Sequence, residues 1–238
     1  MRRYAAFLTA DLHNLTRDPV LLALLFVPLP LGAAIRFGWP AAVEALAPLV
    51  DIGSYRAFAI TFFLILTPGL LGMATGFVML DEREEGVLSA VAVTPVGLAG
   101  LLGYRLVAPA ALCFAMNLVL LWLAGAAFAP WRAPAAAAMA ALEAPLMAVL
   151  LAGIAHNKVE GMALAKGLSF FFLGPFAILF LASPWYWAGA PLPTFWVAKL
   201  LADSGSSPFP ALFWAAFGFA YHLLALWGAA LYFLRRAR

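Results

Sequence analysis

Long apolar stretches separated by short polar segments make up most of this chain of 238 residues. A helix needs roughly 20 consecutive apolar residues to cross the hydrocarbon core of a bilayer. Six stretches approach or exceed that length: residues 20–37, 55–80, 104–128, 135–155, 167–185 and 209–234. They predict an all-α membrane protein with six transmembrane helices, built as a single transmembrane domain over residues 1–238.

Basic residues are distributed unevenly between the two ends of these stretches. With both termini in the cytoplasm, ten of the fourteen Lys and Arg residues lie on the cytoplasmic side, as the positive-inside rule favours. The four on the outer side are Arg36, Arg56, Arg132 and Lys199. The reverse orientation is the alternative, and the closing run of residues 235–238, with three arginines, weighs most against it.

Two segments outside the apolar cores of the spans, residues 1–19 and 183–208, have patterns of their own. In residues 1–19, apolar side chains recur at helical spacing among polar ones, which predicts an amphipathic helix in the membrane interface; a short cytoplasmic extension is the alternative. Residues 183–208 combine prolines and glycines with the aromatic residues Trp185, Tyr186, Trp187, Phe195 and Trp196. Aromatic rings favour the headgroup level, so this outer segment is predicted to be interfacial or re-entrant.

Residues 81–96 interrupt the apolar pattern most sharply. Five consecutive charged residues, Asp81 to Glu85, cannot lie in hydrocarbon, so they predict a solvent-side elbow between the second and third spans. A helix-compatible apolar patch follows at Val87, Leu88 and Val91, and Pro95 ends it. A charged collar beside a short amphipathic helix is typical of a surface that another protein binds.

Composition supports the membrane setting and excludes several classes of function. Hydrophobic residues are 66% and charged residues 11% of the chain, with a mean hydropathy of +0.99, whereas a soluble domain has roughly a quarter charged residues. A net charge of +3 does not suggest a nucleic-acid partner. The chain has no zinc-protease His pair, no Gly-x-Ser-x-Gly elbow and no lysine after a glycine, so neither an intramembrane enzyme nor an ATP-binding loop is indicated, and no metal site is predicted.

Glu143 is the most costly polar residue within a predicted span. It follows Pro134 by nine residues, which places it roughly 13 Å along a helix. A carboxyl group at that depth must be protonated, paired or in contact with water. His222 and Asn117 lie at similar depths and are candidate partners. Two roles stay open for the three residues: hydrogen bonding that holds the bundle together, and a polar point on a transport path.

Three segments together resemble the type-2 ABC exporter permeases. Residues 81–95 are similar to that family's acidic Glu-Arg-Glu-x-Gly segment ending in Val-Thr-Pro, with Val87 where the family often has Thr and Ser89 where it often has Glu. Residues 11–19, ending in Arg-Asp-Pro, resemble its interfacial helix. Residues 157–166 resemble its second cytoplasmic loop.

The resemblance implies a half-transporter of the cytoplasmic membrane of bacteria. Such a subunit pairs with a second permease copy, identical or not, and binds soluble ABC ATPase subunits that hold the ATP and Mg, so this chain itself is expected to carry no cofactor. Carried over, the coupling contacts are Glu82, Arg83, Glu84, Glu85, Gly86, Leu88, Val91, Thr94 and Pro95, with Leu88 and Val91 as apolar anchors. The second cytoplasmic contact is Lys158, Glu160 and Gly161.

The family exports its substrates, and an apolar path suits an amphipathic or hydrophobic cargo such as a drug or a lipid. The alternative is a six-span secondary transporter or channel that works without an ATPase. That alternative calls for polar or charged pairs at mid-membrane, and the chain offers mainly Glu143.

Overall fold

The computed structural model describes residues 7–9, 11, 13, 22–23, 26–128, 130–202 and 208–236. In this part of the chain all regular secondary structure is helical. The elements are α3 (Pro28–Ala33), the π-helical η1 (Ala34–Gly38), α4 (Trp39–Leu46), η2 (Gly53–Tyr55), α5 (Arg56–Glu84), α6 (Val87–Ala92), α7 (Gly97–Leu123), α8 (Arg132–Ala141), α9 (Glu143–Ile154), α10 (Lys158–Leu168), η3 (Ser169–Leu173), α11 (Gly174–Phe180), η4 (Trp185–Gly189), α12 (Pro193–Ala202) and α13 (Pro208–Arg236).

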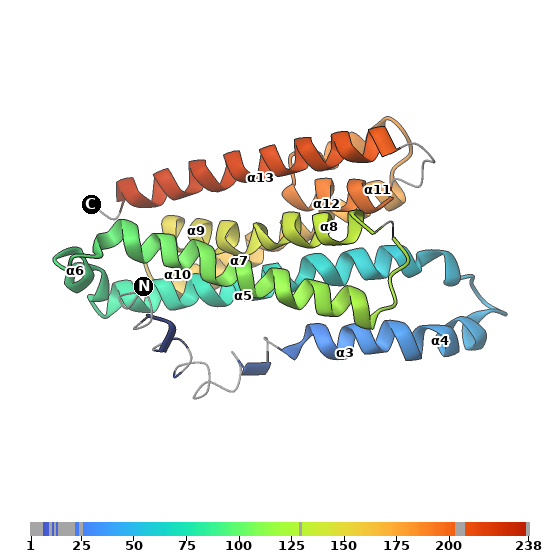
Figure 1. Ribbon diagram of the computed structural model, residues 1–238, viewed down its shortest axis with the longest axis horizontal. Helices are drawn as coiled ribbons and strands as arrows, with labels where there is room; N and C mark the ends of the chain where they lie inside the picture. The colour runs from blue at the N-terminus through green and yellow to red at the C-terminus, as the bar shows by residue number, and fades with distance from the viewer. Residues whose placement is uncertain are drawn as a thin grey trace.

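Five helices among the described residues are long and apolar enough to cross a membrane, and they lie side by side along the long axis of the molecule (Figure 1). They are Gly53–Glu84, Gly97–Leu123, Arg132–Ile154, Lys158–Phe180 and Phe209–Arg236. The predicted first span, residues 20–37, falls partly outside the described residues. Its described portion continues as α3, η1 and α4 to Leu46 and packs beside α7.

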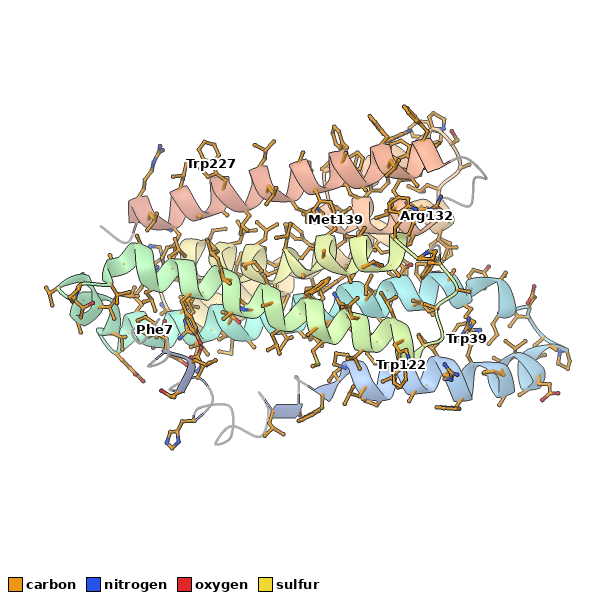
Figure 2. The ribbon with its side chains drawn as sticks, in the orientation of Figure 1. Phe7, Trp39, Trp122, Arg132, Met139 and Trp227 are labelled. Carbon is orange, nitrogen blue, oxygen red and sulfur yellow. The ribbon has the colours of Figure 1, made fainter. Side chains whose placement is uncertain are left out.

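The helix formed by α8 and α9 occupies the centre of the bundle. In its most apolar window 78% of the residues are buried, against 17% in each of the windows of Lys158–Phe180 and Phe209–Arg236. Glycines of α5 allow that helix to approach α9 closely, because a Cβ added at Gly72 would lie 2.5 Å from the carbonyl oxygen of Ala144. Outer side chains are also apolar: Trp227 points away from the bundle while Met139 is buried within it (Figure 2). The apolar exterior is suited to lipid.

The two ends of the bundle differ in structure. The elbow helix α6 and the last turn of α13 lie at one end, and α4, α11 and α12 lie toward the other (Figure 1). The junction between α9 and α10 is also at the α6 end, since α10 contacts α5 near its final turns. Polar side chains from distant parts of the sequence therefore gather around α6.

Several helix boundaries differ from those predicted. The second span continues through the charged run to Glu84, and the third begins at Gly97 and ends at Leu123 instead of covering residues 104–128. The prediction that residues 157–166 form a loop is wrong, because α10 begins at Lys158. The Asn157 side chain accepts the N–H of Glu160, and the Glu160 carboxylate accepts the N–H of His156, so the two side chains cap the start of the helix.

The structure describes residues 1–19 and residues 183–208 to different extents. Residues 7–9, 11 and 13 are helical, and the rest of residues 1–19 lies outside the described part of the chain. In residues 183–208, which are described except for 203–207, η4 is followed by the short helix α12. Helix α12 is enclosed by α5, α8, α11 and α13, and its Phe195, Val197 and Leu200 are fully buried. The α12 part of the aromatic segment is thus inserted into the bundle, whereas Trp185 and Trp187 of η4 are 74% and 39% exposed.

Candidate coupling surface, buried polar pair and groove

The elbow between α5 and α7 is formed by two glycines in the left-handed backbone region. Gly86 has a φ of 75° and Gly97 a φ of 64°, values that residues with a Cβ adopt only at an energetic cost. Gly86 ends α5, its N–H donating to the carbonyl of Arg83, and immediately starts α6. The sequence Glu-Gly-Val-Leu therefore folds as a sharp reversal followed by a short helix.

The two apolar residues expected to face a partner lie against the bundle. Val91 is only 9% exposed. Leu88 lines a small enclosed space whose other walls are Met79, Glu82, Leu98, Leu101, Leu102, Arg105 and Phe233. The hydroxyl of Thr94 donates to the Val91 carbonyl at 2.7 Å and closes the turn.

The outward surface of the elbow is formed by other residues. Val93 is 87% exposed, and Glu84, Glu85, Gly86, Ser89, Ala90, Ala92, Thr94 and Pro95 are exposed as well. The face available to a partner is therefore a rim of carboxylates beside small side chains and one large apolar residue, Val93.

A buried ionic cluster, which sequence reasoning missed, fixes Glu82. Arg105 of α7 is 7% exposed; its Nη1 lies 2.7 Å from Asp11 Oδ2, and its Nη2 is bonded to Glu82 Oε1. The Tyr104 hydroxyl donates to the same Asp11 oxygen at 2.7 Å. In the sequence, Arg105 contributes only one positive charge on the cytoplasmic side. Its partners Glu82 and Asp11 lie 23 and 94 positions away, so no local pattern predicts the pairing. Glu82 therefore holds the start of the elbow to α7.

The second cytoplasmic segment joins the elbow directly. Lys158 Nζ lies 2.8 Å from Asp81 Oδ2, and the backbone N–H of Lys158 donates to Glu84 Oε1 at 2.7 Å. Gly161 faces the same helix so closely that an added Cβ would lie 2.6 Å from Leu80 Cδ1. The two segments that the sequence assigned to coupling thus form one continuous surface.

Two arginines bind the last carbonyls of α9. Arg83 Nη1 donates to the carbonyl of Ala155 at 2.9 Å, and Arg236 Nη1 donates to those of Gly153 and Ile154 at 3.0 and 3.1 Å. Cations at a helix C-terminus satisfy its unpaired carbonyls and interact favourably with the helix dipole. Arg83 therefore fastens the end of α5 to the end of α9.

Glu143 and His222 form a buried pair between α9 and α13. Glu143 is 1% and His222 0% exposed, and His222 Nε2 lies 3.3 Å from Glu143 Oε1. His222 Nδ1 donates to the carbonyl of Gly218 at 2.7 Å. Because Nδ1 carries a proton, a neutral His222 ring can only accept a hydrogen bond at Nε2. One further proton, shared between Nε2 and the Glu143 carboxyl group, is therefore needed for the two side chains to form a hydrogen bond.

Asn117 is equally buried but does not join this pair. Both of its amide atoms and Glu143 Oε2 lack a hydrogen-bond partner in the described structure. Such atoms are costly in a bundle, where no bulk water compensates them. Of the two candidate partners of Glu143, the structure brings His222 to it and leaves Asn117 apart. Among the described residues no group of three His, Cys, Asp or Glu residues is arranged to hold a metal ion.

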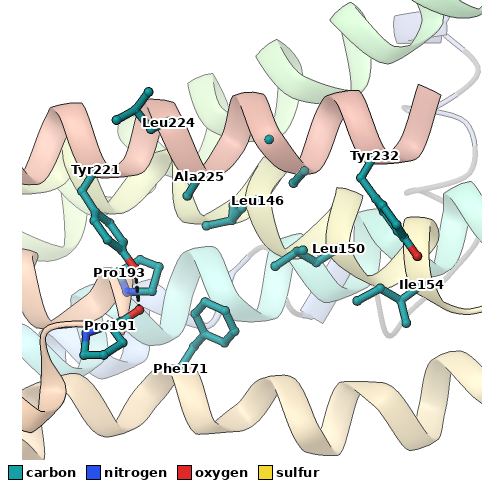
Figure 3. Close-up of a pocket in the computed structure, with 12 residues that line it drawn as sticks. Leu146, Leu150, Ile154, Phe171, Pro191, Pro193, Tyr221, Leu224, Ala225 and Tyr232 are labelled. Carbon is teal, nitrogen blue, oxygen red and sulfur yellow. Dashed lines mark hydrogen bonds between the residues drawn. The ribbon is translucent and has the colours of Figure 1, made fainter. Parts of the chain in front are cut away.

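An open apolar groove of about 660 Å³ separates α9 and η3 from α13 (Figure 3). Leu146, Leu150 and Ile154 of α9 form one wall and Tyr221, Leu224 and Tyr232 of α13 the other, with Phe171, Pro191 and Pro193 completing it. No charged side chain lines the groove.

Comparison with known proteins identifies one family. The family described as fluoroquinolones export permease protein Rv2686c-like matches residues 11–230. Two relatives from Mycobacterium tuberculosis are the fluoroquinolones export permease proteins MT2760 of strain CDC 1551 / Oshkosh and Rv2686c of strain ATCC 25618 / H37Rv. Each is 28% identical to this chain over 235 residues, which cover 95% of this chain and 92% of the relative.

Proposed function

Because this chain belongs to the Rv2686c-like family of fluoroquinolone export permeases, we propose that it exports amphipathic aromatic drugs of the fluoroquinolone type. Membership confirms the resemblance to ABC exporter permeases, and the chain is a multi-pass membrane protein. Permease subunits of these exporters lack ATPase activity, so ATP hydrolysis requires a partner subunit.

The proposed assembly is a pair of permease subunits bound to two soluble ATPase subunits at the α6 end. Both termini and α6 face the cytoplasm in this arrangement, with α3, η1 and α4 as the first of six spans. The positive residues at the α6 end, among them Lys158, Arg235 and Arg236, support this orientation.

One observation carries the coupling proposal: the charged end of α5 is joined both to α7, through Glu82 and Arg105, and to α10, through Asp81 and Lys158. A displacement of the elbow therefore acts on three helices together. In the proposed mechanism, closure of the ATPase subunits moves the elbow, and these contacts convert that motion into rearrangement of the bundle.

Transport in proteoliposomes tests the proposal. The permease is reconstituted into proteoliposomes with a candidate ABC ATPase subunit, and uptake of a fluoroquinolone through the copies whose ATPase side faces outward is followed with ATP or with a non-hydrolysable analogue. Uptake only with hydrolysable ATP, together with drug-stimulated hydrolysis, is expected. Uptake that continues without the ATPase and stops when ion gradients are collapsed would favour the secondary transporter instead.

A further inference from the structure

The groove between α9 and α13 has the length of one membrane leaflet. Its α13 wall runs from Tyr221 to Tyr232, and the eleven steps between these residues rise about 16 Å along a helix. The hydrocarbon core of a bilayer is roughly 30 Å thick, so one leaflet is about 15 Å deep. Tyr221 lies near the middle of α13 and Tyr232 near its end, so the groove extends from mid-membrane to the α6 end of the bundle.

The walls fit a hydrocarbon chain. They are apolar along their length, and Leu224 and Ile154 are 67% and 41% exposed, so the groove opens outward. At its inner end the Tyr221 hydroxyl donates to the carbonyl of Pro191, which leaves that polar group already satisfied (Figure 3). An extended acyl chain buries apolar area here without requiring any new hydrogen bond.

The outer end of the groove is cationic. The guanidinium carbon of Arg236 lies 5.8 Å from the ring centroid of Tyr232, the last groove residue of α13, and the neighbouring Arg235 is exposed. Arg236 uses three donors, two for carbonyls of α9 and one for His156 Nε2 at 2.9 Å. A guanidinium has five donors, so two are left for a further acceptor.

A carboxylate lies close to Arg236 and its His156 partner. Glu160 accepts from His156 Nδ1 at 2.9 Å, on the side of the imidazole away from Arg236. The charge of Glu160 is opposed by Arg236, and the exposed Arg235 beside it adds a second cation, so the mouth of the groove keeps a positive charge. Guanidinium groups bind phosphate oxygens through short, charge-assisted hydrogen bonds.

We propose that the groove binds one anionic phospholipid from the leaflet at the α6 end. One acyl chain lies along α13 from Tyr232 to Tyr221, and the phosphate binds Arg236 and Arg235. This lipid is a resident ligand of the subunit, and the proposal does not depend on the identity of the exported drug.

Native mass spectrometry of the purified permease tests the site, with phosphatidylglycerol and phosphatidylcholine of identical acyl chains as probes. Gly228 lines the groove, and a Cβ there meets nothing within 4 Å, so the side chain of Gly228→Leu begins in open groove space and occupies part of it. Gly103 is equally open but lies on α7, outside the groove, so Gly103→Leu is the matched control. We expect at least about tenfold weaker retention of phosphatidylglycerol in Gly228→Leu and wild-type retention in the control.

The headgroup contact is tested separately with Arg235→Gln, which leaves the Arg236 contacts to α9 intact. Its preference for phosphatidylglycerol over phosphatidylcholine should fall about threefold or more while acyl binding persists. Equal retention by wild type and Gly228→Leu would overturn the acyl site, and equal retention of both lipids by wild type would overturn the anionic headgroup. Disulfide formation between two copies carrying Leu224→Cys, in a background lacking Cys113, would assign the groove to a subunit interface and also refute the proposal.

Discussion

The Glu84 carboxylate accepts a hydrogen bond from the backbone N–H of Lys158 at 2.7 Å. The last residue of α5 thus provides the acceptor for the first backbone N–H of α10. Both Glu84 and Glu85 are exposed, but this contact with α10 belongs to Glu84. Two adjacent acids therefore have different tasks: Glu84 joins helices within the subunit, and Glu85 is presented to solvent.

Charge reversal separates these tasks. Glu85→Lys should leave expression and thermal stability within about 0.5 kcal/mol of wild type, because exposed charges contribute little to folding. It should slow association with the ATPase, because rim charges act mainly on the association rate. Binding kinetics on immobilised permease measure this effect. Glu84→Lys should in addition lower thermal stability, and equal stability of the two variants would refute the distinction.

The apolar residues of the elbow make a second contrast. Val93→Asp should weaken recovery of the ATPase with tagged permease several-fold without changing the melting temperature, because Val93 is 87% exposed. Leu88→Ala should destabilise the permease by about 1–3 kcal/mol, since Leu88 packs from α6 onto side chains of α5, α7 and α13. Co-purification and thermal unfolding in detergent distinguish the two effects. Loss of ATPase binding with Leu88→Ala at unchanged stability would show that Leu88 is the docking residue after all.

The cluster around Arg105 should be sensitive to removal of one charge. Arg105→Met leaves Glu82 and Asp11 without their cation and should cost about 3–5 kcal/mol, as expected for one partner of a buried ion pair. Tyr104→Phe removes one hydrogen bond to Asp11 and should cost only about 1 kcal/mol. Thermal unfolding of the purified variants tests the order, and equal losses would contradict it.

Glu143 allows a test of charge against hydrogen bonding. Glu143→Gln keeps a group that donates to His222 Nε2, so folding and transport should persist if the pair is structural. Glu143→Leu leaves His222 without that partner and should lower stability by about 1–3 kcal/mol. Drug uptake at matched protein levels is the deciding measurement. Loss of uptake in the Gln variant, with normal assembly, would assign the carboxyl group to transport.

Close packing of α5 on α9 predicts a strong effect of a single methyl group. Gly72→Ala places a Cβ 2.5 Å from the Ala144 carbonyl oxygen, which only a backbone shift relieves, and should cost about 1–3 kcal/mol. Gly103→Ala on α7 meets no atom within 4 Å and should be neutral or stabilising by up to about 1 kcal/mol. Melting temperatures of the pair check the prediction, which fails if Gly72→Ala is as stable as Gly103→Ala.

Apolar length predicted the helical membrane architecture because burial in lipid depends on composition over about 20 residues, and five of the spans follow from it directly. Helix ends were predicted less well, because they depend on individual caps. The start of α10 depends on the Asn-x-x-Glu pattern at Asn157 and Glu160, a capping signal that hydropathy alone does not reveal.

Site residues were predicted by type more successfully than by direction. The sequence selected Leu88 and Val91 as apolar members of the elbow, but it could not tell which side of a six-residue helix faces the bundle. The contacts of Arg105 join positions far apart in the chain, and no local periodicity encodes them. Similar depth made His222 and Asn117 equal candidates as partners of Glu143, and depth alone could not show that only His222 reaches it.

The contact of α5 with α9 at backbone distance has a mechanical consequence. At Gly72 and Gly76 the two helices touch at backbone distance and cannot slide past each other without a collision between main chains, so this half of α5 moves together with α9. With 29 residues, α5 is about 43 Å long. A tilt of about 5° about the elbow would carry its opposite end sideways by about 4 Å. A small rotation at one membrane face would thus open a gap of molecular width at the other.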